Sequence, residues 1–375
     1  MKIRAAVLEA MGVPAPYADS KPLKIRELEL KPPGPGEILV RMGAAGLCHS
    51  DLSVINGDRP RPTPMALGHE AAGVVEQVGP GVSDLKPGDH VVLVFMPSCG
   101  ECLPCAEGRP ALCEKGVVAN TAGTLLSGER RLFAGDGSPV YHHMGCSAFA
   151  ERAVVSRRSA VKVPNDLPLE EAALFGCAVL TGVGAVINTA GVRAGTTVAV
   201  VGLGGVGLAS VLGAVASGAR AIVAVDLSDE KLALAKELGA THTFNAAAPN
   251  VVEEVKKATH GGVDYAIEMA GSTRAFETAY RITRRGGTTV TAGLPHPNAT
   301  WAMPGTHLVA EERTIKGSYI GTCVPARDIP RYIDLYRAGK LPVNKLMSGR
   351  LKLEEINKGF DLLHEGKAVR QVVTF

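Results

Sequence analysis

The first third of the chain carries short apolar runs separated by turn residues, a pattern that predicts β-strands. The runs at 38–40, 72–78 and 90–95 are apolar or β-branched, and Pro-Gly or Gly-Pro pairs lie between them. Residues 97–145 differ, because cysteine, proline, glycine and charged residues leave little periodicity there. An irregular segment of that length needs an internal crosslink to stay ordered. We therefore predict a β-rich domain with a crosslinked loop region.

From about residue 180 the pattern changes to buried strands that alternate with helices. We expect these elements at strands 197–201, 221–225, 263–269 and 288–292, and at helices 205–218 and 228–238. Gly261-Gly262 and Gly286-Gly287 are expected to end the helices between the later strands. A helix over 329–338 and a strand over 370–375 follow. Since parallel strands need crossover helices, the pattern predicts an α/β fold with a doubly wound parallel sheet.

One stretch, residues 198–217, has 20 residues without a charge, and hydropathy alone would make it a membrane span. A strand, a Gly-rich turn and a helix account for the same residues, so we favour the globular interpretation. The first ten residues also lack the apolar run of a secretory signal. We therefore expect a cytoplasmic protein without a membrane partner, whose eight cysteines serve metal binding or catalysis instead of disulfides.

The composition excludes further classes of protein. An apolar fraction of 46% with 21% charged residues is typical of a folded globular chain and excludes disorder for most of it. The net charge is +3 and the basic residues are scattered, so no patch exists that could displace the counterions of nucleic acid. The chain has only eight Phe, seven Tyr and one Trp, which also argues against base stacking.

A complete G-x-G-x-x-G motif, Gly202 to Gly207, lies between a predicted strand and a predicted helix. Its glycines allow a tight turn, approach of the backbone to a pyrophosphate, and close packing of helix on strand. Asp226 follows Gly207 by 19 residues, where a carboxylate accepts hydrogen bonds from a ribose and repels a 2′-phosphate. We therefore predict a dinucleotide site that prefers NAD to NADP. The alternative is a purely structural turn capped by Asp226.

Four cysteines, Cys99, Cys102, Cys105 and Cys113, lie within 15 residues. Four thiolates suit a tetrahedral zinc ion with no open position, which is a structural site. An iron–sulfur cluster is the rival, but its usual motif continues with x3-C-P, whereas seven residues precede Cys113 and Glu follows it. We favour zinc, which would also supply the crosslink that the loop region needs.

Three further metal-binding side chains are far apart in the sequence. Cys48 begins the run C-H-S-D, His69 lies within G-H-E, and Cys177 follows Phe-Gly. Each alone is better explained as a buried core residue. Together they offer two thiols and one imidazole, the ligand set of a catalytic zinc with an open position.

In these motifs and their order, the whole chain resembles the zinc-dependent alcohol dehydrogenases of the medium-chain dehydrogenase/reductase family. The resemblance implies a GroES-like catalytic domain at 1–178 and 322–375, with a structural-zinc lobe at 97–115. It implies a Rossmann coenzyme domain at 179–321. The long segment between Cys113 and Cys177 is typical of the longer, dimeric subunits of this family, so a homodimer is expected.

The resemblance assigns Cys48, His69 and Cys177 to a catalytic zinc. Asp51 would orient His69 from behind, and Glu70 would lie behind the metal. Asp51 and Glu70 are therefore expected to be catalytic residues.

The resemblance also makes Ser50 the residue that passes on the substrate proton. The family often has a histidine three residues beyond it, where this chain has Ser53, so water or His49 would take the proton onward. The implied cofactor contacts are His49 and Arg370 at the pyrophosphate, Thr181 and Val206 beside the nicotinamide, and Gly202, Gly204, Gly205, Gly207, Asp226 and Lys231.

The implied reaction is NAD- and zinc-dependent oxidation of primary alcohols to aldehydes, and its reverse, by hydride transfer from a zinc alkoxide. The implied pocket is apolar, which favours medium-chain or aromatic alcohols; its residues are Phe95, Val118, Met144, Leu294 and Tyr319, with Arg59 at the mouth. Arg59 and Val117 replace the acid and arginine of the glutathione-dependent branch, which disfavours that activity. The alternatives are an NADPH-dependent aldehyde or ketone reductase and a non-catalytic nucleotide-binding relative.

Overall fold

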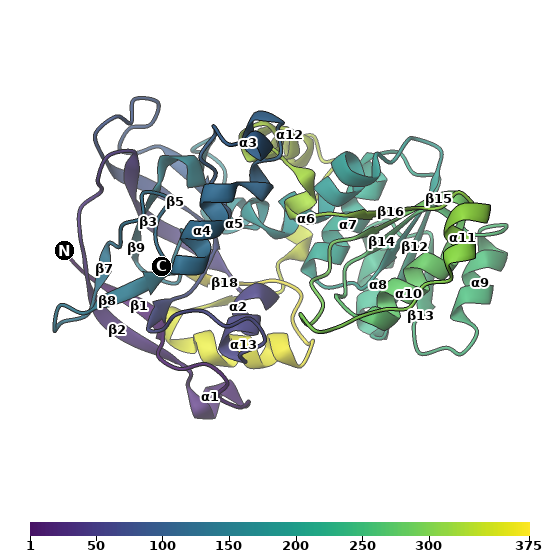
Figure 1. The fold of residues 1–375 in the computed structure, drawn as a ribbon, viewed down its shortest axis with the longest axis horizontal. Coiled ribbons are helices and arrows are strands. Elements are labelled where there is room, and N and C mark those ends of the chain that lie inside the picture. Colours follow the sequence, from purple (N-terminus) through teal and green to yellow (C-terminus); the bar gives the residue numbers. More distant parts are fainter. The chain divides into compact units, whose positions relative to one another are not determined.

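The computed structural model describes all 375 residues, which form two compact units (Figure 1). Unit 1 comprises residues 1–177, 324–330 and 347–375, and unit 2 comprises residues 178–323 and 331–346. Helix α12 (Pro325–Arg337) contains residues of both units. The division into a catalytic and a coenzyme domain stays a prediction about function.

Unit 1 is built on two sheets. A closed barrel joins β1 (Lys2–Leu8), β2 (Leu23–Leu30), β7 (Leu132–Phe133), β8 (Pro139–His142) and β4 (Met65–Ala66). The second sheet has the order β10 (Ala160–Val163), β6 (His90–Leu93), β5 (Glu70–Val78), β3 (Glu37–Gly46), β18 (Gln371–Thr374) and β17 (Gly349–Leu351), and β9 (Arg152–Ser156) also pairs with β3. The β-rich domain expected from the first third is therefore present.

The helices of unit 1 are short. They are α1 (Tyr17–Ser20), α2 (His49–Ile55), α3 (Leu103–Ala106), α4 (Glu114–Ala122), α5 (Leu169–Ala173) and α13 (Ile356–His364), with short 3-10 turns at Pro110–Leu112, Arg157–Ser159, Leu174–Gly176 and Leu353–Glu355. Two of them lie in the cysteine-rich segment, which is thus less irregular than its sequence indicates. Cys113 begins α4 by accepting the Gly116 N–H at its Sγ, 3.3 Å away. Such short helices leave too few turns for a hydrophobic period.

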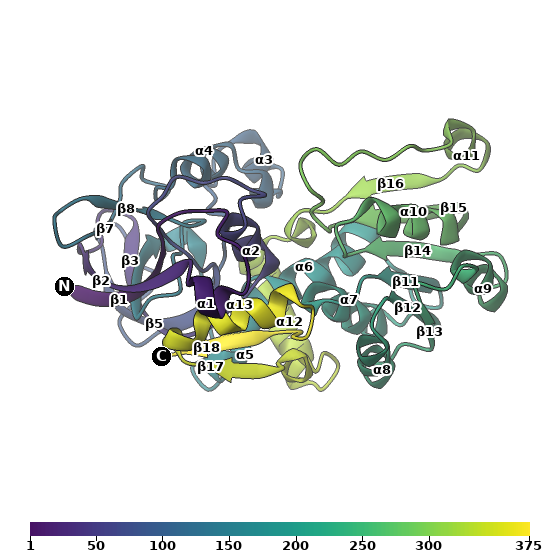
Figure 2. The same cartoon turned by 90° about the horizontal axis from the view of Figure 1, so that it is seen from below.

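Unit 2 holds a six-stranded parallel sheet, and Figure 2 shows its strands one below another, from β16 to β13. Its order is β13 (His242–Asn245), β12 (Ala221–Asp226), β11 (Thr197–Val201), β14 (Val263–Glu268), β15 (Thr283–Thr291) and β16 (Thr314–Gly317). The helices are α6 (Ala178–Gly184), α7 (Gly205–Ala216), α8 (Asp229–Glu237), α9 (Val251–Ala258), α10 (Thr273–Ile282) and α11 (Gly305–Ala310). The predicted α/β class and doubly wound parallel sheet are confirmed.

One predicted helix end in unit 2 is wrong. Helix α10 ends at Ile282, and Gly286-Gly287 lie inside β15 instead of closing the helix. Thr283 is already extended, and its hydroxyl donates 2.8 Å to the Ala279 carbonyl oxygen. A β-branched residue that satisfies the end of the last turn in this way lets a strand follow directly.

The charge-free stretch 198–217 forms β11 and α7, joined by the Gly-rich turn. No single helix is long and apolar enough to cross a membrane, although the bent pair Leu169–Gly176 and Ala178–Ala190 passes that test by length and composition.

Candidate functional site

The strand register of unit 1 brings distant residues to one end of its second sheet. In the antiparallel pair β3–β5, Gly46 lies opposite Glu70. Cys48 comes two residues after Gly46, and His69 comes one residue before Glu70, so both leave the sheet at the same end. In the pair β18–β3, Val372 also lies opposite Gly46, which places Arg370 beside them.

Cys177 reaches the same place through β6. Leu93 at the end of β6 lies opposite Ala71 of β5. The 3-10 turn at Leu174–Gly176 packs so closely on this strand that a Cβ on Gly176 would lie 2.3 Å from the Leu93 carbonyl oxygen. Only glycine allows that approach, and the next residue is Cys177.

The structure brings Cys48, His69 and Cys177 together. Their ligand atoms all lie within 4.8 Å of one another, and His69 Nε2 is 3.7 Å from Cys177 Sγ. Zinc with bond lengths of about 2.0–2.3 Å separates tetrahedral ligands by about 3.6–3.8 Å. All three side chains are buried. Two thiols and an imidazole at this spacing fit a zinc ion.

A buried ion pair lies behind these three residues. Arg370 Nη1 is 3.3 Å from Glu70 Oε2, and it also donates to the Leu47 carbonyl oxygen at 3.0 Å. Neither carboxylate oxygen of Glu70 has a hydrogen-bond donor, and burial raises its pKa to about 7 against the opposing charge of Arg370. A cation at the neighbouring thiols would stabilise this carboxylate. Arg370 was expected at the cofactor pyrophosphate, and that role stays a prediction.

Asp51 holds the far side of the His69 ring. The His69 Nδ1 lies 3.1 Å from Asp51 Oδ1, and the Gly68 N–H donates to the same oxygen at 3.1 Å. Burial alone would raise the pKa of Asp51, but His69 and His143 outweigh it and leave that pKa lowered. The ionised carboxylate selects the tautomer that carries hydrogen on Nδ1, which leaves Nε2 free to bind a metal.

Sequence reasoning missed His143. Its Nδ1 lies 3.2 Å from the same Asp51 Oδ1, and its side chain is completely buried. The parallel pair of β4 and β8, with Ala66 opposite His142, carries residues 67–69 and 143 forward side by side. No local motif marks such a contact, although the neighbouring Met144 was assigned to the pocket.

The two remaining predicted catalytic residues lie at the start of α2. His49 is exposed and Ser50 is half-buried. Ser53, which stands where the family often has a histidine, donates its hydroxyl to the His49 carbonyl oxygen at 2.8 Å. This serine is therefore engaged in its own helix.

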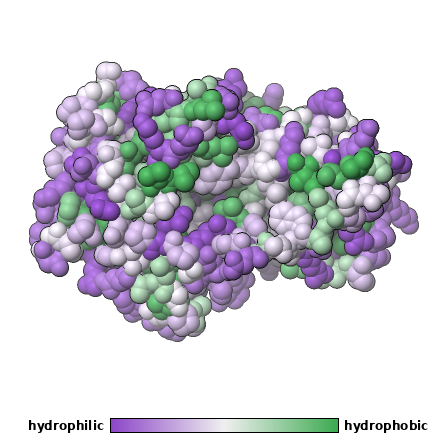
Figure 3. Space-filling model, in the orientation of Figure 1, coloured by the Kyte–Doolittle hydropathy of each residue, from purple (hydrophilic) through white to green (hydrophobic).

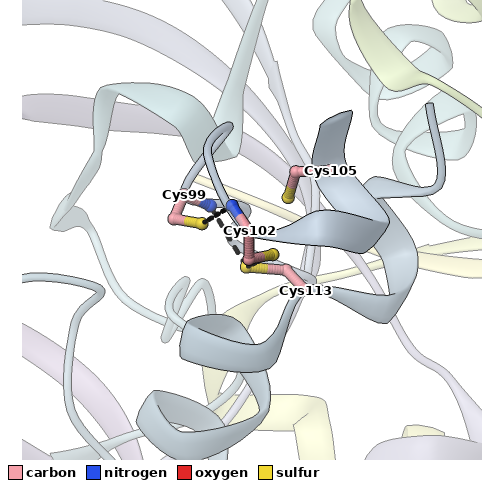
Figure 4. Close-up of side chains that lie close together, drawn as sticks. All are labelled: Cys99, Cys102, Cys105 and Cys113. Atoms are coloured by element: carbon pink, nitrogen blue, oxygen red, sulfur yellow. Dashed lines mark hydrogen bonds between the residues drawn. The ribbon is translucent and has the colours of Figure 1, made fainter. Parts of the chain in front are cut away.

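The four-cysteine cluster forms as its spacing predicts (Figure 4). Its sulfur atoms lie within 4.8 Å of one another, and Cys102 Sγ is 3.9 Å from Cys113 Sγ, which fits a zinc tetrathiolate. The N–H groups of Glu101 and Cys102 donate to Cys99 Sγ and lower its pKa to about 6, although desolvation opposes them. Burial raises the pKa of Cys105 to about 12.

In unit 2 the Gly-rich turn has the conformation that its motif requires. Gly202 has a φ of 93°, which favours glycine, and a Cβ on Gly207 would lie 1.8 Å from the Gly202 carbonyl oxygen. A Cβ on Gly204 would meet no atom within 4 Å, so the start of α7 is open. Asp226 ends β12 and accepts the Leu203 N–H at 2.6 Å and the Ser228 N–H at 2.9 Å.

The other predicted cofactor residues also belong to unit 2. Gly205 is buried at the start of α7. Three other residues are half-buried: Val206 on α7, Thr181 on α6 and Lys231 on α8. Their contact with a cofactor stays a prediction.

The predicted pocket residues are divided between the units. In unit 1 the Phe95 ring stands edge-on to His69, with ring centroids 5.2 Å apart, while Met144 and Arg59 are half-buried. Val118 is exposed on α4, and the face of the molecule drawn in Figure 3 carries several separate apolar areas among its polar surface. Leu294 and Tyr319 are exposed residues of unit 2. Among the pocket residues of unit 1, Phe95 lies directly against one of the metal-binding residues, His69.

Comparison with known proteins agrees with this architecture. Residues 34–165 match the alcohol dehydrogenase GroES-like domain, and residues 205–338 match the zinc-binding dehydrogenase domain. The NDMA-dependent alcohol dehydrogenase of Amycolatopsis methanolica is 42% identical, with 100% of this chain and 99% of that protein covered. The S-(hydroxymethyl)glutathione dehydrogenase of Paracoccus denitrificans is 37% identical, with both chains covered completely.

Among solved structures, the benzyl alcohol dehydrogenase of Acinetobacter calcoaceticus superposes with a TM-score of 0.93 at 33% identity, covering 100% of this chain and 99% of the other. The chain belongs to the zinc-dependent medium-chain alcohol dehydrogenase family. It is therefore a zinc-binding oxidoreductase of the GroES-like and Rossmann type that acts on alcohols.

Proposed function

We propose that this protein is an NAD-dependent dehydrogenase of primary alcohols, with medium-chain or aromatic substrates. Cys48, His69 and Cys177 hold its catalytic zinc, and the four-cysteine cluster holds a structural zinc. The convergence of two thiols and an imidazole from three distant segments, all buried, carries the proposal.

The residues around the site have separate tasks in this proposal. A zinc ion there supplies a Lewis acid that lowers the pKa of an alcohol and polarises an aldehyde. Asp51 keeps the His69 ring in place, and Glu70 with Arg370 balances charge behind it. The Ser50 hydroxyl accepts the substrate proton and passes it to His49 or water, since Ser53 cannot act as a base near neutral pH.

Asp226 supports NAD as the coenzyme. Its carboxylate lies at the carboxyl end of β12, held by the Gly-rich turn, where it would repel a 2′-phosphate. Initial rates with NAD⁺, NADP⁺ and NDMA as acceptors test this choice. Preference for NADP⁺ would favour the reductase alternative. Turnover with NDMA alone would indicate the same acceptor dependence that the Amycolatopsis relative is named for.

An aromatic pocket wall supports the substrate class. Phe95 stands against His69, and the benzyl alcohol dehydrogenase structure is closely similar. Arg59 and Val117 disfavour the glutathione adduct that the Paracoccus relative is named for. We expect higher kcat/KM for benzyl alcohol and medium-chain alcohols than for S-(hydroxymethyl)glutathione.

Metal analysis and a scan of alcohols on one sample test the whole proposal. Two zinc ions per chain and activity on primary alcohols are expected. One or no zinc, with no activity on any primary alcohol, would indicate the non-catalytic relative instead. Light scattering tests the accompanying proposal of a homodimer.

A further inference from the structure

Two histidines share one oxygen of a buried carboxylate in unit 1. Asp51 Oδ1 lies 3.1 Å from His69 Nδ1 and 3.2 Å from His143 Nδ1. All three side chains have no exposed surface. Taking one carboxylate and two imidazoles out of water is costly unless the groups satisfy one another.

A tight turn holds His143 at this position. Its N–H donates to the Ser147 hydroxyl oxygen at 3.0 Å, and its carbonyl accepts the Cys146 N–H at 3.0 Å. The Ala148 N–H then donates to the Gly68 carbonyl oxygen at 3.0 Å, next to His69. The backbone that carries His143 is therefore bonded to the backbone that carries His69.

The two neighbours of the His69 ring differ in chemistry. Phe95 and His143 both stand edge-on to it, with ring centroids 5.2 Å and 5.6 Å away. Phe95 can only pack, whereas His143 brings a nitrogen to the carboxylate that orients His69. An apolar ring would fill the His143 position without burying two polar nitrogens.

The ring nitrogens of His143 make no polar contact besides the one with Asp51. Neither ring nitrogen has an aligned hydrogen bond, and the contact with Asp51 is its one ion-pair contact. The second oxygen of Asp51, Oδ2, is also buried without a hydrogen-bond partner. A buried polar group of this kind needs a functional reason.

We propose that His143 is a positioning residue of the catalytic metal centre. It contacts Asp51 Oδ1 beside His69 and restrains that oxygen, so that the carboxylate keeps His69 Nε2 directed at Cys48 and Cys177. This inference rests on the proposed function, because it presumes that those three residues hold zinc. Outer partners of this kind typically change metal affinity 10–100-fold when they are lost.

The test compares His143→Phe, which keeps a ring but removes both nitrogens, with His143→Asn, whose amide nitrogen can replace Nδ1. A chelator competes for zinc, and the four-cysteine zinc serves as an internal reference. We expect H143F to release the catalytic zinc about 10–100-fold more readily, H143N to stay within about threefold of wild type, and the reference to stay constant. The absorption spectrum of the cobalt-substituted catalytic site should change in H143F and be restored in H143N.

His142→Gln is the matched control. His142 is equally buried, but its Nε2 accepts the Arg131 N–H at 3.0 Å, its Nδ1 lies 3.4 Å from the Ser147 hydroxyl, and the histidines in ion-pair contact with Asp51 are His69 and His143. H142Q should release the catalytic zinc as wild type does.

Each other outcome decides against one of the two proposals. If H143F keeps its zinc within about threefold, or if H143N releases it as readily as H143F, the positioning role is wrong while the proposed function stands. If wild type holds only the four-cysteine zinc, the proposed function fails first. Should H143F not fold, H143A takes its place against H143N in the same measurement.

Discussion

The two cysteine-containing clusters of unit 1 offer a direct comparison. The four-cysteine cluster uses residues within one short segment, and three of its four cysteines are partly exposed. The cluster of Cys48, His69 and Cys177 draws on three segments, the last two residues are 108 positions apart, and all three are buried.

The difference separates stability from chemistry. A local cluster with four thiols can fill a tetrahedron by itself and leaves no open position, so it crosslinks its own loop. The dispersed cluster offers three ligands, and its neighbours Asp51, Glu70 and Arg370 are all buried charged groups. A catalytic metal site needs buried charged groups of this kind beside its ligands. Only the packed fold can hold such groups away from water, which a local loop could not do.

The largest expected effect is loss of the dispersed cluster. In Cys48→Ser we expect kcat/KM to fall at least about 1,000-fold, because the metal supplies several kcal/mol of transition-state stabilisation. Zinc content should fall to that of the four-cysteine cluster, with the unfolding temperature little changed. A C48S variant that kept both its zinc and most of its activity would contradict the assignment.

Loss of the local four-cysteine cluster should lower stability and leave activity nearly unchanged. Cys105→Ser removes one of four ligands in the local cluster, and we expect the free energy of unfolding to fall by about 3 kcal/mol or more. Proteolysis should then cut within residues 99–115, while kcat/KM per folded molecule at low temperature stays within about threefold of wild type. A comparable loss of activity in C105S would mean that the clusters are not independent.

Thiol reactivity in the metal-free protein should rank the clusters by exposure. Cys99 is partly exposed with a pKa lowered to about 6, whereas the pKa of buried Cys177 is raised well above its usual range by the Cys48 thiol and by desolvation. At pH 7 the reagent iodoacetamide should modify Cys99 at least about 10-fold faster than Cys177, measured by mass spectrometry. Equal rates would show that the dispersed cluster opens readily without metal.

The smallest expected effect concerns His142, a buried histidine of unit 1 that is not part of either cluster. Burial, with Arg130 and Arg131, lowers the pKa of His142 from 6.5 to about 3. Between these values the unfolded chain binds a proton that the folded chain does not, so stability is complete above pH 6.5 and is lost as the pH falls.

The pH dependence of unfolding measures this term. His142→Gln should reduce the slope of unfolding free energy between pH 4 and 6 by up to about 1.4 kcal/mol per pH unit. An unchanged slope in H142Q would assign the acid sensitivity to other groups.

Much of the protein could be predicted from short sequence patterns. The Gly-rich turn, Asp226 at the end of the next strand, and the four-cysteine spacing are all determined by neighbouring residues, and the structure has them as expected. The short helices of the cysteine-rich segment and the start of β15 at Thr283 could not be predicted from the sequence. Capping contacts determine the former, and one β-branched residue determines the latter.

The sequence by itself determined which side chains could bind metal and coenzyme, because thiols, imidazoles and glycines carry that chemistry wherever they lie. Only the tertiary structure decided that Cys48, His69 and Cys177 meet, and that His143 joins them on Asp51. Those contacts follow from the register of β3, β5 and β6 and from the pairing of β4 with β8, between strands far apart in the chain. Such pairings depend on the packing of the whole sheet, so no local pattern of residues encodes them.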